Sequence, residues 1–359
     1  MIKYIGSKRR LVPVLGAIAT VAGARRALDL FTGTTRVAQE LKLRGAHVTA
    51  VDTARYAEMF AQCYVALDGA HADVAAIEDA LRDLTGRPGV DGYVTDTFCT
   101  QARFFQPHNG RRIDAMRDAI ERDYRDSWMY PVLLTSLIEA ADRVDSTTGV
   151  QMAYVKQWAD RSYRDIALRV PELVAGPGAA IRADAVDAVR TLGHFDLAYL
   201  DPPYNQHRYF TNYHVWETLV AWDAPEHYGV ACKRVDARDV ATKSVFNDRR
   251  AMPAALASVI AGVEADLVVV SYNNESWVAV EELEAACRAR GAAVETLAFE
   301  SRRYVGAQIG IHNPDGKKVG KVSHLRNLEY VVCAGDRALV DRIVGMGDEL
   351  WRLPATSRS

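Results

Sequence analysis

The most chemically specific stretch of this chain is Asp-Pro-Pro-Tyr at residues 201–204. It directly follows residues 195–200, an apolar run with the pattern of a buried strand. Proline has no backbone N–H for a sheet ladder, so the strand should end with Asp201 at its carboxyl end, where open α/β sheets bind ligands. Asp201 and the Pro202 carbonyl can accept both hydrogens of an exocyclic amine, and Tyr204 can stack on the base that carries it. Asp-Pro-Pro alone fits a rigid turn with a surface aspartate equally well.

A second constellation lies nearer the amino terminus and is typical of a nucleoside site. Residues 27–31 read as a strand, Gly33 lies in the turn after it, and a helix-like pattern leads to a second strand, 47–51, that ends at Asp52. This is the Rossmann arrangement, in which an acid about twenty residues after the turn binds ribose hydroxyls. Dinucleotide sites have three glycines in this turn. A single glycine therefore favours a nucleoside without a pyrophosphate, such as S-adenosylmethionine.

The remaining apolar runs supply the elements that position these two constellations. Further strands are predicted at 179–183, 266–272, 294–299 and 328–334, and helices at 252–263 and 278–290. The strand 179–183 ends at Asp184, another acid at a strand end. We therefore expect an α/β fold with a doubly wound, Rossmann-like sheet.

Residues 56–171 interrupt this alternation, because helical periodicity recurs there without a convincing strand signal. The periodicity includes residues 152–168. We predict a helical insert at 56–171 between two parts of a core, 1–55 and 172–359. Basic residues beside aromatic ones in the insert suit contacts with a nucleic-acid backbone, and so does a basic hairpin after the turn at 313–316, although solvated surface charge explains such clusters too. The candidate contacts are Arg111, Arg112, Lys317, Lys318 and Lys321.

The composition limits the class of protein. The net charge of -2 indicates no overall basic field, so any nucleic-acid contact must come from local patches. The five cysteines are odd in number and include no Cys-x-x-Cys pair, which favours reduced thiols and no structural metal. No apolar run has the length of a membrane span or a signal sequence. We expect a soluble, cytoplasmic protein with no membrane partner.

Three segments together resemble the Dam-like (class alpha) adenine-specific DNA methyltransferases. They are residues 3–8 (Lys-Tyr-Ile-Gly-Ser-Lys), the loop 29–34 and the tetrapeptide 201–204. In that family an amino-terminal cofactor segment precedes the cofactor loop, a recognition insert and the catalytic tetrapeptide, and this chain has the same order. Residues 213–218 also follow the tetrapeptide as in many members. One departure is Thr35, which stands where the family often has a second glycine.

The resemblance implies S-adenosylmethionine as the cofactor and double-stranded DNA as the substrate. It assigns Asp201, Pro202 and Tyr204 to catalysis. It implies cofactor binding by Tyr4, Lys8, Asp29, Gly33, Thr34, Asp52 and Asp184. Lys8 would pair with the methionine carboxylate, and Asp184 would accept the amine of the cofactor's adenine. Membership of a restriction-modification or phage-defence system follows as an expectation, with a cognate restriction endonuclease as a candidate partner.

Chemistry from the residues agrees with this resemblance. An aromatic amine is a poor nucleophile, and two acceptors placed off the ring plane localise its lone pair for in-line attack on a sulfonium methyl. Asp201 would stabilise the positive charge that develops on nitrogen, and no metal is needed. The target base must leave the duplex stack first.

Two alternatives keep the same fold: an RNA adenine methyltransferase and a non-catalytic nucleic-acid-binding subunit. Aspartate at position 201 favours adenine over cytosine as the target. The large insert favours duplex DNA over RNA, and the presence of Asp201 and Asp52 argues against a non-catalytic subunit. The sequence specifies neither the DNA recognition sequence nor the oligomeric state.

Overall fold

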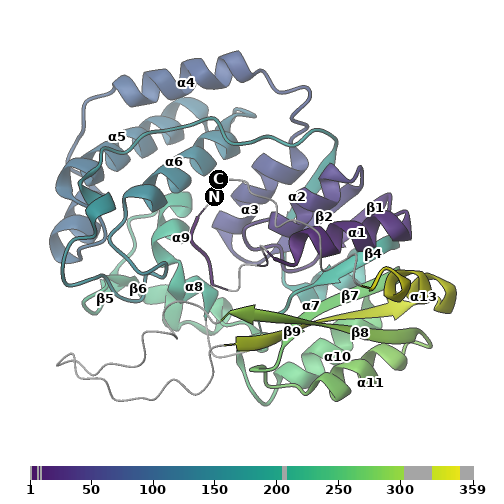
Figure 1. Cartoon of the computed structure of the whole chain (residues 1–359). Coiled ribbons are helices and arrows are strands. Elements are labelled where there is room, and N and C mark those ends of the chain that lie inside the picture. The colour runs from purple at the N-terminus through teal and green to yellow at the C-terminus, as the bar shows by residue number, and fades with distance from the viewer. Residues whose placement is uncertain (1, 6–7, 9, 204–207, 303–325, 348–359) are drawn as a thin grey trace.

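The chain folds around a seven-stranded sheet in the computed structural model (Figure 1). The structure describes residues 2–5, 8, 10–203, 208–302 and 326–347. Across the sheet the strands follow the order β3-β2-β1-β4-β7-β9-β8. Their bounds are β1 Arg26–Asp29, β2 His47–Asp52, β3 Gly178–Arg182, β4 Phe195–Leu200, β7 Ala265–Asn273, β8 Ala293–Arg302 and β9 Arg326–Gly335.

The first five strands of this order are parallel, and β9 runs antiparallel between β7 and β8. Helical crossovers connect the parallel strands, as parallel pairing requires. The α/β, doubly wound, Rossmann-like fold expected from the sequence is thereby confirmed. Leu28 of β1 lies opposite Ala198 of β4, so the carboxyl ends of these strands meet at one edge of the sheet.

Helices cover both faces of the sheet, and alternate residues of the strands face each layer (Figure 1). Leu197 and Tyr199 of β4 pack into one hydrophobic cluster, whereas Ala198 and Leu200 pack into the other. The first cluster includes side chains of α1 Val12–Ala22, α2 Arg36–Leu43, α3 Arg55–Ala61 and α13 Arg337–Gly345. The second includes side chains of α7 Ala185–Thr191, α10 Met252–Gly262 and α11 Val280–Arg288.

The connection from β2 to β3 contains helices and irregular segments but no strand. The helices are α3, α4 Val74–Gly86, α5 Pro107–Tyr124 and α6 Tyr130–Val144, with π-helical turns at Gln62–Ala66 and Val94–Gln101. Ile113 of α5 and Leu134 of α6 belong to the same hydrophobic cluster as Val48 of β2. The helical block therefore packs directly on the sheet layer. The boundaries expected for this block, residues 56 and 171, stay predictions. Its role in DNA recognition also stays a prediction.

The segment after β4 returns along the same edge of the sheet before α10 begins. Its elements are α8 Tyr209–Asn212, α9 His214–Ala221, β5 His227–Tyr228 and β6 Lys233–Arg234, followed by short 3-10 turns at Val235–Arg238, Val240–Thr242 and Val245–Asn247. β5 and β6 form a small antiparallel hairpin.

The helix predicted at residues 152–168 is wrong, because this stretch is irregular coil with turns and bends around a 3-10 turn at Asp160–Tyr163. Several of its backbone polar groups bond to side chains of neighbouring elements. Asn109 of α5 donates to the carbonyls of Ser162 and Arg164 and accepts from the N–H of Ile166. These tertiary bonds satisfy the backbone and outweigh the local helical pattern.

Two expectations from composition concern redox state and membranes. All five cysteines are free and buried. Within the described ranges, no helix combines the length and apolar character needed to cross a bilayer. The basic hairpin predicted around residues 313–321 lies outside the described residues.

Candidate functional site

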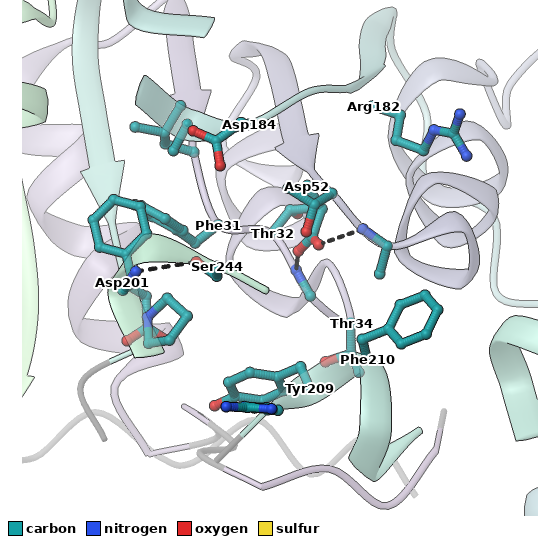
Figure 2. Close-up of a pocket in the computed structure, with 18 of the residues that line it drawn as sticks. Phe31, Thr32, Thr34, Asp52, Arg182, Asp184, Asp201, Tyr209, Phe210 and Ser244 are labelled. Atoms are coloured by element: carbon teal, nitrogen blue, oxygen red, sulfur yellow. Dashed lines mark hydrogen bonds between the residues drawn. The ribbon is translucent and has the colours of Figure 1, made fainter. Parts of the chain in front are cut away.

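A cavity of about 500 Å³ opens at the carboxyl ends of the parallel strands (Figure 2). This volume is typical of sites for small organic ligands. An acid at each of four strand ends contributes to the wall: Asp29 is the last residue of β1 and Asp52 the last of β2, whereas Asp184 follows β3 and Asp201 follows β4.

The structure brings most of the predicted site residues to this one cavity, from segments far apart in the sequence. The lining includes Tyr4, Lys8, Asp29, Gly33, Thr34, Asp52, Asp184 and Asp201. Pro202 is buried beside the cavity, and Pro203 lines it. Tyr204, Lys317, Lys318 and Lys321 lie outside the described residues.

The loop after β1 is fixed by Asp52. The carboxylate accepts the Gly33 N–H at 2.8 Å and the Ala54 N–H at 3.0 Å (dashed in Figure 2). Burial raises the pKa of Asp52, and these backbone N–H groups oppose the rise. The carboxylate therefore joins the loop to the second strand and still presents its remaining lone pairs to the cavity.

Thr35 keeps the backbone course that a glycine would allow. Its φ is 62°, in the left-handed region that β-branched residues rarely occupy. The Thr35 side chain accepts a hydrogen bond from Gln39 Nε2 at 2.8 Å and donates to the Thr34 carbonyl. Local hydrogen bonds thus hold the loop where the sequence departs from the family pattern.

The amino-terminal segment lies across this loop through its tyrosine. The Tyr4 ring stacks on Tyr213, with centroids 4.6 Å apart, and on Tyr209 at 5.3 Å. A Cβ atom added to Gly33 would lie 3.2 Å from the Tyr4 ring. The N–H of Ile5 donates to the Tyr213 hydroxyl at 2.7 Å. Gly33 is therefore required both for its φ of 49° and for the close approach of Tyr4.

Asp29 has one carboxylate oxygen in use and one without a partner. Oδ2 accepts from Thr32 Oγ1 at 3.0 Å and from the Ala38 N–H at 3.1 Å. Oδ1 is buried and has no hydrogen-bond partner among the described residues. Burial raises the pKa of Asp29 to about 7. A buried unpaired acceptor on a cavity wall fits a ligand that brings a hydrogen-bond donor.

Asp201 is engaged by two side chains. Lys8 Nζ lies 3.1 Å from Asp201 Oδ1, and Ser271 Oγ donates to the same oxygen at 3.1 Å. Burial raises the pKa of Asp201, and Lys8 opposes that rise. Lys8, predicted to bind the methionine carboxylate, pairs with the predicted catalytic carboxylate in this structure.

Sequence reasoning missed Glu217 of α9 as a site residue. It lines the cavity and is only 2% exposed. Its carboxylate accepts the backbone N–H of Arg55 at 3.0 Å, at the start of α3. Burial raises the pKa of Glu217 to about 7. The only sequence signal was its place in the stretch 213–218 that follows the tetrapeptide.

The turns between β6 and α10 form a further wall that no sequence pattern indicated. Ser244 and Phe246 line the cavity, and Phe246 packs edge-on against Phe31 with centroids 5.0 Å apart. Phe31 lies in the loop that follows β1, so this contact ties the wall to that loop.

Arg111 and Arg112 lie on α5 and do not line the cavity. Arg111 Nε lies 2.6 Å from Asp91 Oδ1, and Arg112 donates to the carbonyls of Arg87 and Thr85. Both arginines therefore have intramolecular contacts beside α4. Their predicted contact with DNA stays a prediction.

One group of potential metal ligands occurs within the described ranges: His194, Asp196 and Asp266. These residues lie at the amino ends of β4 and β7, at the sheet edge opposite the cavity. Asp196 accepts the backbone N–H groups of Arg25 and Arg26, and His194 bonds to Asp266. The contacts give this group a structural role away from the cavity.

Comparison with known proteins yields one family match. A model of the D12 class N6 adenine-specific DNA methyltransferase family matches residues 4–286. The matched range includes the amino-terminal segment from Tyr4, the loop after β1 and the tetrapeptide at 201–204.

Individual relatives cover most of this chain. The type II methyltransferase M.NlaIII of Neisseria lactamica is 28% identical over 295 residues, or 78% of this chain and 86% of the relative. The modification methylase StsI of Streptococcus sanguinis is 27% identical over 299 residues, or 78% of this chain and 45% of that protein. The type II methyltransferase M.FokI of Planomicrobium okeanokoites is 29% identical over 194 residues, or 52% of this chain and 29% of that protein.

Proposed function

Because the chain belongs to the D12 class N6 adenine-specific DNA methyltransferase family, we propose that it methylates the 6-amino group of a flipped adenine with S-adenosylmethionine bound in the cavity of Figure 2. The chain is an adenine-specific DNA methyltransferase. The observation that carries the residue assignment is the convergence of Asp29, Asp52 and Asp201 on one cavity at the sheet edge. An open α/β sheet binds its ligands at this edge.

The chain's own residues fit the methyl donor. Asp52 ends the second strand and has lone pairs for ribose hydroxyls beyond its two backbone bonds. The unpartnered oxygen of Asp29 suits the ammonium group of the methionine part. Asp184 accepts the Val186 N–H with one oxygen, which leaves the other for the amine of the cofactor's adenine. When bound, S-adenosylmethionine supplies an electrophilic methyl group.

Asp201 and the Pro202 carbonyl then hold the amine of the target adenine. Two acceptors off the ring plane localise the nitrogen lone pair, and the carboxylate stabilises the positive charge that forms on nitrogen. Lys8 favours the charged form of Asp201 and so opposes the effect of burial. Tyr204, predicted to stack on the base, and Tyr209, which lines the cavity, would offset the free energy of unstacking.

The biological setting is also a proposal. Relatives of this chain carry the names of type II methyltransferases and modification methylases, which supports a place in a restriction-modification or phage-defence system. A cognate restriction endonuclease and a cytoplasmic location are parts of the same proposal. The helices between β2 and β3 match a recognition insert in their position along the chain.

The test is transfer of a labelled methyl group to unmethylated DNA, followed by digestion and separation of the nucleosides. We expect label in N6-methyl-2′-deoxyadenosine from the parent protein. Asp201→Ala should lower turnover by at least about a hundredfold, because it removes the acceptor made for the transition state. Its S-adenosylmethionine affinity, from calorimetry, and its thermal midpoint should stay close to those of the parent. Label in cytosine, or near-parent turnover of the variant, would contradict the proposal.

A further inference from the structure

The cations along the cavity wall differ in whether the protein itself provides them with a partner. Three lie within ion-pairing distance of a carboxylate: Lys8–Asp201 at 3.1 Å, Arg55–Glu217 at 3.8 Å and Arg182–Glu58 at 3.7 Å. Arg36 is also engaged within the protein. Arg208 and Lys243 are exposed, and neither side chain has a hydrogen bond or an ion pair in the described part of the chain.

These two cations stand on backbone that is fixed close to the catalytic strand. Arg208 directly precedes α8, whose first residue, Tyr209, lines the cavity in Figure 2. Lys243 stands between two 3-10 turns, and its N–H donates to the Val240 carbonyl at 3.0 Å. The next residue, Ser244, accepts the Phe246 N–H and lines the same cavity. The backbone at Lys243 is therefore held in place, whereas its ammonium group is available to bind an external anion.

The chemistry of a flipped nucleotide explains why free cations belong at this position. The base enters the cavity, but the sugar stays attached to the strand, so the phosphates on either side must lie near the mouth. The cavity wall contains the carboxylates Asp29, Asp52 and Asp201, which repel those phosphates. A cation already paired with a protein carboxylate gives little net attraction. An unpaired cation offers its full charge to an external anion.

We propose that Arg208 and Lys243 bind the phosphates that flank the flipped adenine. The inference rests on the proposed function, since it takes the base in the cavity to be part of a DNA strand. It adds two DNA contacts on the segment after the tetrapeptide, separate from the helical insert. The carboxylate of the cofactor is the other anion with the same chemistry, and the experiment distinguishes the two.

The experiment measures binding to a mixed-sequence duplex in which an adenine lies opposite an abasic site. Such an adenine leaves the stack at low free energy, and phosphate contacts do not read bases, so no recognition sequence is needed. Fluorescence anisotropy across a salt series gives the dissociation constant and its salt dependence. The variants are Arg208→Ala, Lys243→Ala and the double variant. Arg249→Ala is the matched control, because Arg249 is exposed nearby but does not line the cavity.

Each single variant should weaken DNA binding by about three- to tenfold near 0.1 M salt. It should also flatten the slope of log affinity against log salt by about one unit, and the double variant by about two. The Arg249→Ala control and the charge-conserving variants Arg208→Lys and Lys243→Arg should keep the parent slope. Both residues are exposed, so the thermal midpoints should not change.

Calorimetric titration of the same variants with S-adenosylmethionine identifies the anion. Unchanged cofactor affinity with a flattened DNA slope supports the phosphate contacts. A double variant that keeps the salt slope of the parent for DNA binding overturns the proposal. If its cofactor affinity is also reduced, the two cations bind the cofactor carboxylate instead. Methyl transfer by the parent protein tests the proposed function separately. A parent that binds DNA with this salt dependence but methylates no adenine would refute the function and leave the phosphate contacts standing.

Discussion

Among the groups around Asp201, Lys8, whose Nζ lies 3.1 Å away, opposes the effect of burial most strongly. Burial raises the pKa of Asp201, and the Lys8 charge opposes it. The ionised carboxylate is the form that accepts the amine hydrogens, so activity should fall as the pH falls through this pKa. Removing the Lys8 charge leaves burial unopposed and raises the pKa further. In Lys8→Gln the acid limb of kcat against pH should therefore move upward by about one pH unit.

This prediction is checked at saturating S-adenosylmethionine, so that weaker cofactor binding by the variant does not affect the profile. Lys8→Arg is the control, because it keeps the positive charge and should keep the acid limb near that of the parent. If the limb in Lys8→Gln coincides with that of the parent, Lys8 does not control the ionisation of Asp201.

Glu217 predicts a second pH effect, this time on stability. Burial raises its pKa from 4.5 to about 7 in the folded protein. The folded state therefore holds a proton that the unfolded chain releases, and the resulting stability is full below about pH 4.5 and lost as the pH rises to about 7. Glu217→Gln has no such titration. It should gain free energy of unfolding relative to the parent between about pH 5 and about pH 8, measured by urea denaturation. A constant difference between the two proteins across this range would show that Glu217 is not protonated in the folded state.

At the scale of elements, the loop after β1 combines two left-handed residues with a close ring contact. Thr35 adopts a φ of 62°, which costs about 1–2 kcal/mol for a residue with a Cβ atom. Its hydrogen bonds to Thr34 and Gln39 stabilise this conformation. Gly33 adopts a φ of 49°, and Tyr4 occupies the space beside it. The loop is therefore shaped by the amino-terminal segment as well as by its own residues.

Gly33→Ala tests this arrangement, and Gly23→Ala provides a matched control. Both glycines have a positive φ, but a Cβ atom at Gly23 would meet nothing within 4 Å, whereas one at Gly33 would meet the Tyr4 ring at 3.2 Å. Each variant should lose about 1 kcal/mol of stability from backbone strain. Only Gly33→Ala should also bind S-adenosylmethionine more weakly in a calorimetric titration. Equal cofactor affinities in the two variants would mean that Tyr4 yields to the new methyl group without disturbing the site.

At the scale of the whole molecule, one hydrophobic cluster joins the helical block to the sheet. Ile113 and Leu134 of the block pack in the same cluster as Val48 and Leu197 of the strands. Lys3 adds a polar link, because its Nζ lies 3.0 Å from Asp142 of α6. Shared burial of this kind couples the stability of the two parts.

We therefore expect one cooperative unfolding transition. Differential scanning calorimetry should give a calorimetric enthalpy close to the van't Hoff enthalpy, because neither part can lose its packing alone. Fluorescence of the tryptophans and far-ultraviolet circular dichroism should report the same midpoint. Two resolved transitions would instead indicate that the helical block unfolds as a separate domain.

The sequence by itself determined the catalytic strand and the class of fold. Residues 195–200 form β4 as predicted, because an apolar run that ends at two prolines has few other ways to fold. The acids at positions 52, 184 and 201 were recognisable because each follows an apolar run, whereas Asp29 lay within the predicted strand 27–31. Parallel strands place such positions at one edge of the sheet. The local sequence pattern was sufficient to predict a strand or its end wherever residues next to each other in the chain decide which side chains are buried and where the chain turns.

Tertiary structure alone decided which charges pair and which segments close the cavity. The Lys8–Asp201 pair joins residues nearly two hundred positions apart, and no local pattern encodes such a contact. The wall at Phe246 and the buried Glu217 depend on packing against Phe31 and α3, respectively. The helix predicted at 152–168 fails for the same reason, since Asn109 binds its backbone. Likewise β9, the last strand in the described part of the chain, lies between β7 and β8, because strand order follows from the packing of the whole sheet and not from sequence order.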